Sequence, residues 1–158
     1  MGNQAGISTL WRLLMILISH RGNTNGSFPE LENNPGYIVK TIDAGFQVEI
    51  DVWCVEDTFY LGHDAPQYKI QESFLMNDDL WCHAKNFEAL RRLLKINAKC
   101  FWHENDDFTL TSTNNIWTFP NKQVEQNSII VCKNIDETKK YSKLNIFGIC
   151  SDFVGELI

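Results

Sequence analysis

The sequence of 158 residues predicts an α/β fold, a reduced TIM-like (β/α)8 barrel in which several helices are missing after strands 5 and 6. Three observations support this prediction. Short apolar runs recur along the chain, helical patterns separate several of them, and the chain is shorter than the about 250 residues of a typical barrel of this class. An open α/β sheet is the alternative that the same pattern allows.

Eight apolar runs are the expected strands, and many of them end on a polar residue. Their content of β-branched and aromatic residues is typical of strands. The expected strands, in order, are MILISH (15–20), FQVEIDVW (46–53), TFYLGH (58–63), LWCHAK (80–85), KCFWHE (99–104), NIWTFP (115–120), SIIVC (128–132) and IFGICSD (146–152).

Helices are expected between strands 1 and 2 and between strands 4 and 5. In the first, Pro35 suits the opening turn of a helix and Gly45 suits its end. In the second, Asn86 suits the N-cap, and the apolar residues of NFEALRRLLKIN fall on one face. A third, weaker helix is expected over 136–145 and a single turn over 69–77. Strands that alternate with helices predict parallel pairing.

The connections after strands 5 and 6 are too short or too polar for helices. The segment NDDFTLTSTNN (105–115) alternates apolar and polar residues, which indicates an extended excursion. The wall exposed there needs a cover, which we expect to be this excursion, the N-terminal residues or a second copy of the chain in a homo-oligomer. Residues 15–158 are expected to form one barrel domain, and residues 1–14 a peripheral N-terminal extension.

The net charge of −6 argues against a nucleic-acid partner that binds through a basic face. Five cysteines, an odd number without a CxxC pair, each lie in or beside an apolar run. This pattern favours free buried thiols in a reducing compartment, and hence a cytoplasmic location. No apolar stretch is long enough for an integral membrane segment.

FQVEIDVW is the most informative strand, because Gln47, Glu49, Asp51 and Trp53 share one face. Two carboxylates on one buried face repel each other and are costly to desolvate. A bound divalent cation removes that conflict, and Mg²⁺ and Ca²⁺ prefer oxygen ligands. The alternative is an antiparallel strand with a solvated face.

The four histidines, His20, His63, His83 and His103, all fall at or near the end of an expected strand. In barrels of this class the active site lies at that edge. His83 and Lys85 repeat the two-residue spacing of the carboxylates, so they suit a metal ligand and an anion-binding cation. The alternative is a polar strand end that leads into the helix beginning near Asn86.

Such residues suit the cleavage of a phosphodiester. One histidine removes a proton from the nucleophile, and another donates a proton to the leaving oxygen. A metal ion, Arg21 and Lys85 stabilise charge on the phosphoryl oxygens. Gly22 lets the chain turn close to the ligand after the first strand.

Four segments resemble the glycerophosphodiester phosphodiesterase family, within the phospholipase-C-like phosphodiesterases. They occur in the family's order and at close to its spacing, across about the first third of the chain. The segments are HRGN at 20–23, ENNP at 32–35, AGFQVEIDV at 44–52 and LGHDAP at 61–66. The resemblance implies an eight-stranded α/β barrel.

The resemblance also implies roles for particular residues. His20 and His63 would be the acid/base pair, Arg21 would bind phosphate, and Glu49 and Asp51 would bind one divalent cation. Mg²⁺ or Ca²⁺ is the expected ion, with Mn²⁺ as a further candidate.

Two positions qualify the resemblance. The third metal carboxylate of the family falls at His83 here, whereas Lys85 is preserved as a phosphate-binding residue. That difference puts the third ligand in doubt and can alter the preferred metal. The final GICSDF (148–153) is similar to the family's last strand, and Asp152 is given no chemical role.

The expected function is therefore a metal-dependent hydrolase of a small glycerophosphodiester or related alcohol-phosphate diester. One alternative is a non-catalytic protein that binds a phosphorylated ligand on the same barrel. Another is a metal-independent lyase that forms a cyclic phosphate, against which Glu49 and Asp51 together argue.

Overall fold

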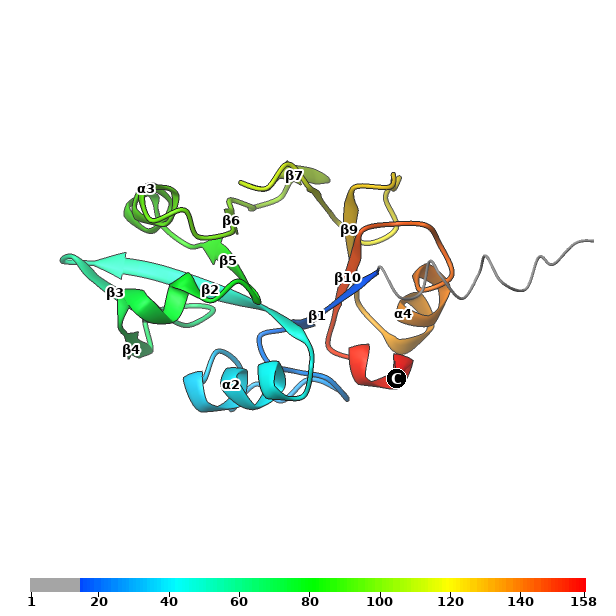
Figure 1. Cartoon of the computed structure of the whole chain (residues 1–158), viewed down its shortest axis with the longest axis horizontal. Helices are drawn as coiled ribbons and strands as arrows, with labels where there is room; N and C mark the ends of the chain where they lie inside the picture. The colour runs from blue at the N-terminus through cyan, green and yellow to red at the C-terminus, as the bar shows by residue number, and fades with distance from the viewer. Residues whose placement is uncertain (1–14) are drawn as a thin grey trace, which may run out of the picture.

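A computed structural model of the chain describes residues 15–158 (Figure 1). Residues 1–14, the expected N-terminal extension, lie outside the described residues. From residue 15 onward the strands form one mixed sheet of 10 strands that curves into a partial barrel, and helices cover only part of its outer surface. This is the reduced barrel that the sequence predicts.

Among the described residues, seven strands pair in parallel, in the order β6-β5-β2-β1-β10-β9-β8. The first and last of these strands in the sequence, β1 and β10, are therefore neighbours in the middle of the order, and β6 and β8 are its two ends. The bounds are β1 Ile16–His20, β2 Gln47–Val55, β5 Leu80–Ala84, β6 Cys100–Phe101, β8 Ile116–Thr118, β9 Ser128–Cys132 and β10 Gly148–Ser151.

The third expected strand is the one that differs from the prediction. β3 (Thr58–Leu61) pairs antiparallel with β2, and β4 (Tyr68–Ile70) pairs antiparallel with β3. The two residues between β2 and β3, Glu56 and Asp57, both have positive φ, 47° and 60°. This is the geometry of a two-residue hairpin turn, and a parallel partner would need a crossover of a dozen or more residues. The prediction of a parallel strand here was wrong.

The helix-poor side lies between β6 and β8, where the described chain has no helix from residue 96 to 134. β7 (Phe108–Leu110) pairs with β8, and the next residues reach back to β6. The backbone N–H of Ser112 donates to the Cys100 carbonyl at 2.8 Å, and the Ser112 hydroxyl accepts from the Cys100 N–H at 2.9 Å. The extended excursion thus bridges the two ends of the ring. That residues 1–14 or a second copy add to this cover stays a prediction.

The helices form where the sequence predicts them. α2 (Pro35–Asp43) packs against β2, α3 (Phe87–Lys95) against β2, β5 and β6, and α4 (Ile135–Tyr141) against β9 and β10. Two 3₁₀ turns, η1 (Glu72–Met76) and η2 (Val154–Leu157), complete the fold. Each α-helix begins after an asparagine whose side chain accepts a hydrogen bond from the first turn. None of the helices in residues 15–158 is long and apolar enough to span a membrane.

The core has an inner and an outer part. The outer part lies between the sheet and its helices. The inner part fills the barrel below the mouth with Ile18, Trp81, Phe101, Trp117, Ile129 and Cys150. All five cysteines are buried and free, as the sequence predicts.

Asn86 joins α3 to the sheet, so its replacement is expected to weaken both. Its side chain accepts from the Ala89 N–H at 3.0 Å and from the Cys54 N–H at 3.1 Å, and it donates to the Cys54 carbonyl at 2.8 Å. Asn86→Ala is expected to lower the free energy of unfolding by about 1–3 kcal/mol, measured by urea denaturation. The matched variant Asn134→Ala removes a side-chain cap that bonds only Glu137, so an equal or larger loss there would contradict the prediction.

Candidate active site

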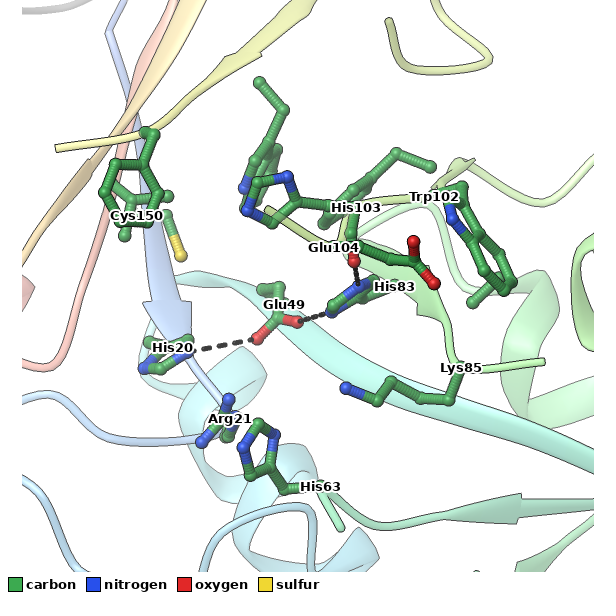
Figure 2. A pocket seen from close by; sticks show the side chains of 15 residues that line it. His20, Arg21, Glu49, His63, His83, Lys85, Trp102, His103, Glu104 and Cys150 are labelled. Atoms are coloured by element: carbon green, nitrogen blue, oxygen red, sulfur yellow. Dashed lines mark hydrogen bonds and ion pairs between the residues drawn. The ribbon is translucent and has the colours of Figure 1, made fainter. Parts of the chain in front are cut away.

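A cavity of about 430 Å³ opens at the C-terminal ends of the parallel strands. Active sites of α/β barrels lie at this face. Figure 2 shows that its polar side chains come from β1, from β2, from β5 and from the segments that follow β1, β3, β5 and β6. The lining residues used below are His20, Arg21, Glu49, His63, His83, Lys85, Phe101, Trp102, His103, Trp117 and Phe119.

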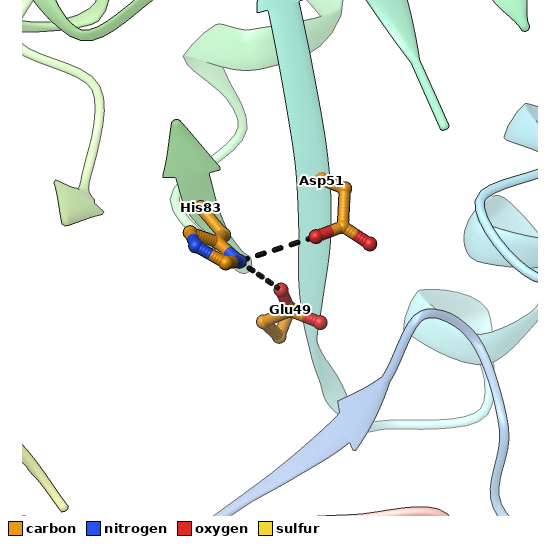
Figure 3. A group of neighbouring side chains, drawn as sticks. All are labelled: Glu49, Asp51 and His83. Atoms are coloured by element: carbon orange, nitrogen blue, oxygen red, sulfur yellow. Dashed lines mark ion pairs between the residues drawn. The ribbon is translucent and has the colours of Figure 1, made fainter. Parts of the chain in front are cut away.

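Glu49, Asp51 and His83 form the centre of the site (Figure 3). β2 and β5 pair in a register that sets Asp51 beside His83, and the alternation of β2 brings Glu49 to the same inner face. The His83 Nδ1 lies 3.1 Å from Asp51 Oδ1 and 3.7 Å from Glu49 Oε1. Two side chains that are two residues apart on β2 therefore converge with one side chain from β5 on a single point.

Both carboxylates are buried, with Glu49 at 3% and Asp51 at 0% exposure. Burial, followed by the charge of Asp51, raises the pKa of Glu49. Burial would also raise the pKa of Asp51, but hydrogen bonds from His63 and His83 and the charge of Arg21 hold it well below its ordinary value. Glu49 Oε2 has no hydrogen-bond partner among the described residues, whereas Asp51 Oδ1 faces His83 and Lys85. An unpartnered carboxylate oxygen close to a second carboxylate and an imidazole nitrogen fits a divalent cation.

Arg21 occupies a sharp turn directly after β1. Its φ is 58°, and Gly22 follows at φ 101°, where a Cβ would lie 2.5 Å from the ring of Tyr37. The guanidinium of Arg21 contacts Asp51 Oδ2 through Nε at 2.9 Å and Glu32 Oε2 through Nη1 at 3.1 Å. This explains the HRG sequence: the turn needs glycine, and it holds the arginine between two carboxylates at the edge of the cavity.

His20 lies at the end of β1 between two acidic residues. Its Nδ1 is 3.0 Å from Asp152 Oδ1, and its Nε2 is 3.8 Å from Glu49 Oε2. Burial would lower the pKa of His20, but the hydrogen bond to Asp152 and the charge of Glu49 raise it. Burial also opposes the ionised form of Asp152, whose pKa is nevertheless lowered by the hydrogen bond with His20. Asp152 thus orients the imidazole and leaves its Nε2 facing Glu49.

His63 and Lys85 approach Asp51 from two further elements. The β2–β3 hairpin returns the chain to the cavity, where the Gly62 N–H donates to the Asp51 carbonyl at 3.2 Å. His63 follows and places its Nδ1 3.5 Å from Asp51 Oδ2. Lys85 extends β5 and places its Nζ 3.7 Å from Asp51 Oδ1. His63 therefore reaches the site although β3 is antiparallel.

Comparisons with known proteins bear on the fold. No family model matches the sequence, and a search of curated proteins gives no significant match. Among solved structures, the crystal structure of glycerophosphodiester phosphodiesterase from Thermotoga maritima is similar, with a TM-score of 0.59 and 16% identity over 90% of this chain and 96% of that chain. The chain has the fold of this phosphodiesterase. The reduced TIM-like barrel predicted from the sequence is thereby confirmed, with seven parallel strands in the described residues instead of the eight that the resemblance implies.

All seven site residues proposed from the sequence lie together at one face of this barrel: His20, Arg21, Glu49, Asp51, His63, His83 and Lys85. Sequence reasoning missed three supporting residues. Asp152 bonds His20, Glu32 binds Arg21, and Asn33 donates to Asp51 Oδ2 at 2.9 Å. Glu32 and Asn33 belong to the ENNP segment, so the resemblance included these residues but did not predict their contacts with Arg21 and Asp51.

Proposed function

We propose that the chain is a metal-dependent phosphodiesterase that hydrolyses a glycerophosphodiester or a related alcohol-phosphate diester. The observation that carries the proposal is the convergence of two imidazoles and two cationic side chains on a buried pair of carboxylates in one cavity. The phosphodiesterase fold supports it. A binding protein has no need for two histidines placed for proton transfer, so the geometry favours an enzyme.

In the proposed mechanism, His20 and His63 exchange protons with the attacking and leaving oxygens. Asp152 holds the His20 ring at Nδ1, and Nε2, which lies 3.8 Å from Glu49 Oε2 without a hydrogen bond to it, is the atom available for transfer. Arg21 and Lys85 bind the phosphate, and their positions are fixed by Asp51. Glu49, Asp51 and His83 would hold one divalent cation, which when bound withdraws charge from the phosphoryl oxygens.

The other side of the cavity suits the alcohol part of the substrate. Phe101, Trp102, Trp117 and Phe119 line it and provide an aromatic surface. Phe101 and Trp117 stack with their ring centroids 4.2 Å apart, so this surface is packed against the barrel core. A cavity of about 430 Å³ is within the range of small-molecule sites, which supports a small diester as the substrate.

The test measures release of the alcohol, such as choline, ethanolamine or p-nitrophenol, by the purified chain with Mg²⁺, Ca²⁺, Mn²⁺ and Co²⁺. The panel contains glycerophosphocholine, glycerophosphoethanolamine and bis-p-nitrophenyl phosphate. Turnover that stops after chelation and returns with metal is expected. Binding of these diesters without turnover would instead support the non-catalytic alternative, and full activity after exhaustive chelation would support the metal-independent lyase.

Asp152→Asn is expected to lower kcat about tenfold or more while KM changes little, because Asp152 orients His20 and does not reach the cavity lining. Steady-state kinetics separates the two constants. A rise in KM with an unchanged kcat would contradict the positioning role of Asp152. Circular dichroism of the variant controls for folding.

A cytoplasmic location is also proposed. The support is that all five cysteines are free and buried, which suits a reducing compartment.

A further inference from the structure

The imidazole of His83 is held on both sides. Its Nε2 lies 2.9 Å from the backbone carbonyl of His103, and its Nδ1 faces the two buried carboxylates. A carbonyl oxygen only accepts hydrogen bonds, so Nε2 is the protonated nitrogen. Nδ1 is then the nitrogen that faces Asp51 Oδ1 and Glu49 Oε1, where it can donate a proton to Asp51 or, once that proton has left, bind an ion with its lone pair.

The ring is fixed in this orientation by packing. It stacks on Phe101 with an interplanar angle of 7° and a centroid separation of 5.0 Å. The side chain is 13% exposed, so rotation about its bonds would break both the stacking and the hydrogen bond to His103. An imidazole whose far nitrogen bonds a backbone carbonyl is the usual arrangement of a metal-ligating histidine.

Two carboxylates that face one point repel each other unless a positive charge lies between them, and a proton on Nδ1 or a bound cation can supply that charge. Glu49 Oε2 is buried and has no hydrogen-bond partner among residues 15–158, which is a second observation that favours a cation here. The donor atoms of the three residues lie within 4.8 Å of one another (Figure 3). Donors that share one ion at about 2.1 Å are on the order of 3 Å apart, so small adjustments suffice.

We propose that His83 makes this site selective for a divalent ion that accepts imidazole nitrogen, of the class of Co²⁺ and Zn²⁺, over Mg²⁺ and Ca²⁺. The inference rests on the metal site of the proposed function. Mg²⁺ and Ca²⁺ depend on oxygen ligands and on the number of negative charges around them, and an imidazole supplies neither. Co²⁺ and Zn²⁺ bind imidazole well.

The neighbouring cations strengthen this argument. Arg21 and Lys85 both contact Asp51, so part of the negative charge of the two carboxylates is already balanced before an ion enters. Such neighbours lower the affinity most for an ion that is held mainly by charge attraction. They lower it less for an ion that also forms a bond to the nitrogen of His83.

The first test compares metal binding by the intact chain and by His83→Glu, using calorimetry with Co²⁺ and Mg²⁺ alone and no substrate. Most sites prefer Co²⁺ to Mg²⁺ to some degree, so the measured quantity is the change in the ratio of the two Kd values. We expect the ratio Kd(Mg²⁺)/Kd(Co²⁺) to fall at least about tenfold in His83→Glu. An unchanged ratio would overturn the proposal. His103→Gln is the matched control, because His103 contacts Nε2 of His83 only through its backbone carbonyl, and its ratio should stay at the wild-type value.

The second test needs no variant and therefore does not depend on folding of a mutant. In the Co²⁺-loaded wild-type chain, the Nε2–H of His83 should appear in proton NMR as a strongly shifted, slowly exchanging imidazole resonance, because it is bonded to the His103 carbonyl. Absence of any such resonance, or failure of the chain to bind Co²⁺, would overturn the inference. A chain that shows the resonance but has no activity would contradict the phosphodiesterase proposal alone. An active chain whose ratio of Kd values is unchanged in His83→Glu would contradict the selectivity alone.

Discussion

Replacing either His20 or His63 with alanine is expected to lower kcat/KM for a glycerophosphodiester by about 10²–10⁴-fold, the usual contribution of one positioned proton donor or acceptor. The two imidazoles come from different elements, and neither holds the proposed metal donors in place on its own. Substrate binding should therefore survive, and the loss should appear mainly in kcat.

Two substrates separate the roles of the two histidines. A glycerophosphodiester has a poor leaving group that needs a proton, whereas p-nitrophenolate leaves without one. The variant that lacks the general acid should recover much of its activity on bis-p-nitrophenyl phosphate, and the variant that lacks the base should not. Recovery by one variant and not the other would assign each role.

The matched control for these variants is His103→Ala. His103 lines the same cavity but has no role in proton transfer in the proposed mechanism, so this variant should keep most of its activity. If His20→Ala and His63→Ala were no worse than His103→Ala on both substrates, proton transfer by His20 and His63 would be ruled out.

Asp51→Asn is expected to destabilise the fold and to abolish activity. Asp51 is fully buried, and Arg21, Lys85, His63 and His83 all lie within 4 Å of its carboxylate. The amide removes the charge that balances these groups, and breaking a buried ion pair from one side costs about 3–5 kcal/mol. The same change removes a proposed metal donor and releases Arg21, so turnover should fall by at least about 10³-fold.

Urea denaturation in the absence of metal measures the stability of Asp51→Asn, and the phosphodiester assay measures its activity. Asp64→Asn is the matched control, because the Asp64 side chain is 95% exposed and lies 3.6 Å from the His63 Nε2. That variant should stay close to the wild type in stability. A stability of Asp51→Asn equal to that of Asp64→Asn would show that Asp51 does not balance the buried cations.

The elements of this fold were largely predictable because their signals are local. Asn86 caps α3, as its position before an apolar helical face indicates. Pro35 begins α2, and the helix-poor stretch between β6 and β9 follows from polar connections without helical periodicity. The parallel pairing was wrong at β3, because Glu56 and Asp57 are not the Asn-Gly type of residues that mark a hairpin turn. In the sequence, only the short connection between β2 and β3 indicated that these strands pair antiparallel.

The site was predictable as a set of residues but not as a network. The two-residue spacing of Glu49 and Asp51 gives their common face, and the motifs give the other members. The contact between Asp51 and His83 depends on the register of β2 and β5, which no local pattern sets. The bond between Asp152 and His20 joins residues 132 positions apart, so no local signal could have revealed it.

The uneven distribution of helices determines which part of the cavity can accept substitutions. The carboxylates and His83 sit on β2 and β5, which are braced from outside by α2 and α3. The aromatic wall facing them comes from residues 101–119, a stretch that no helix covers. Phe101 and the His103 backbone support His83, so they belong to the rigid half. Substitutions at Trp102 and Phe119, which make neither of these contacts, can reshape the proposed space for the alcohol while His83 and the carboxylates keep their support.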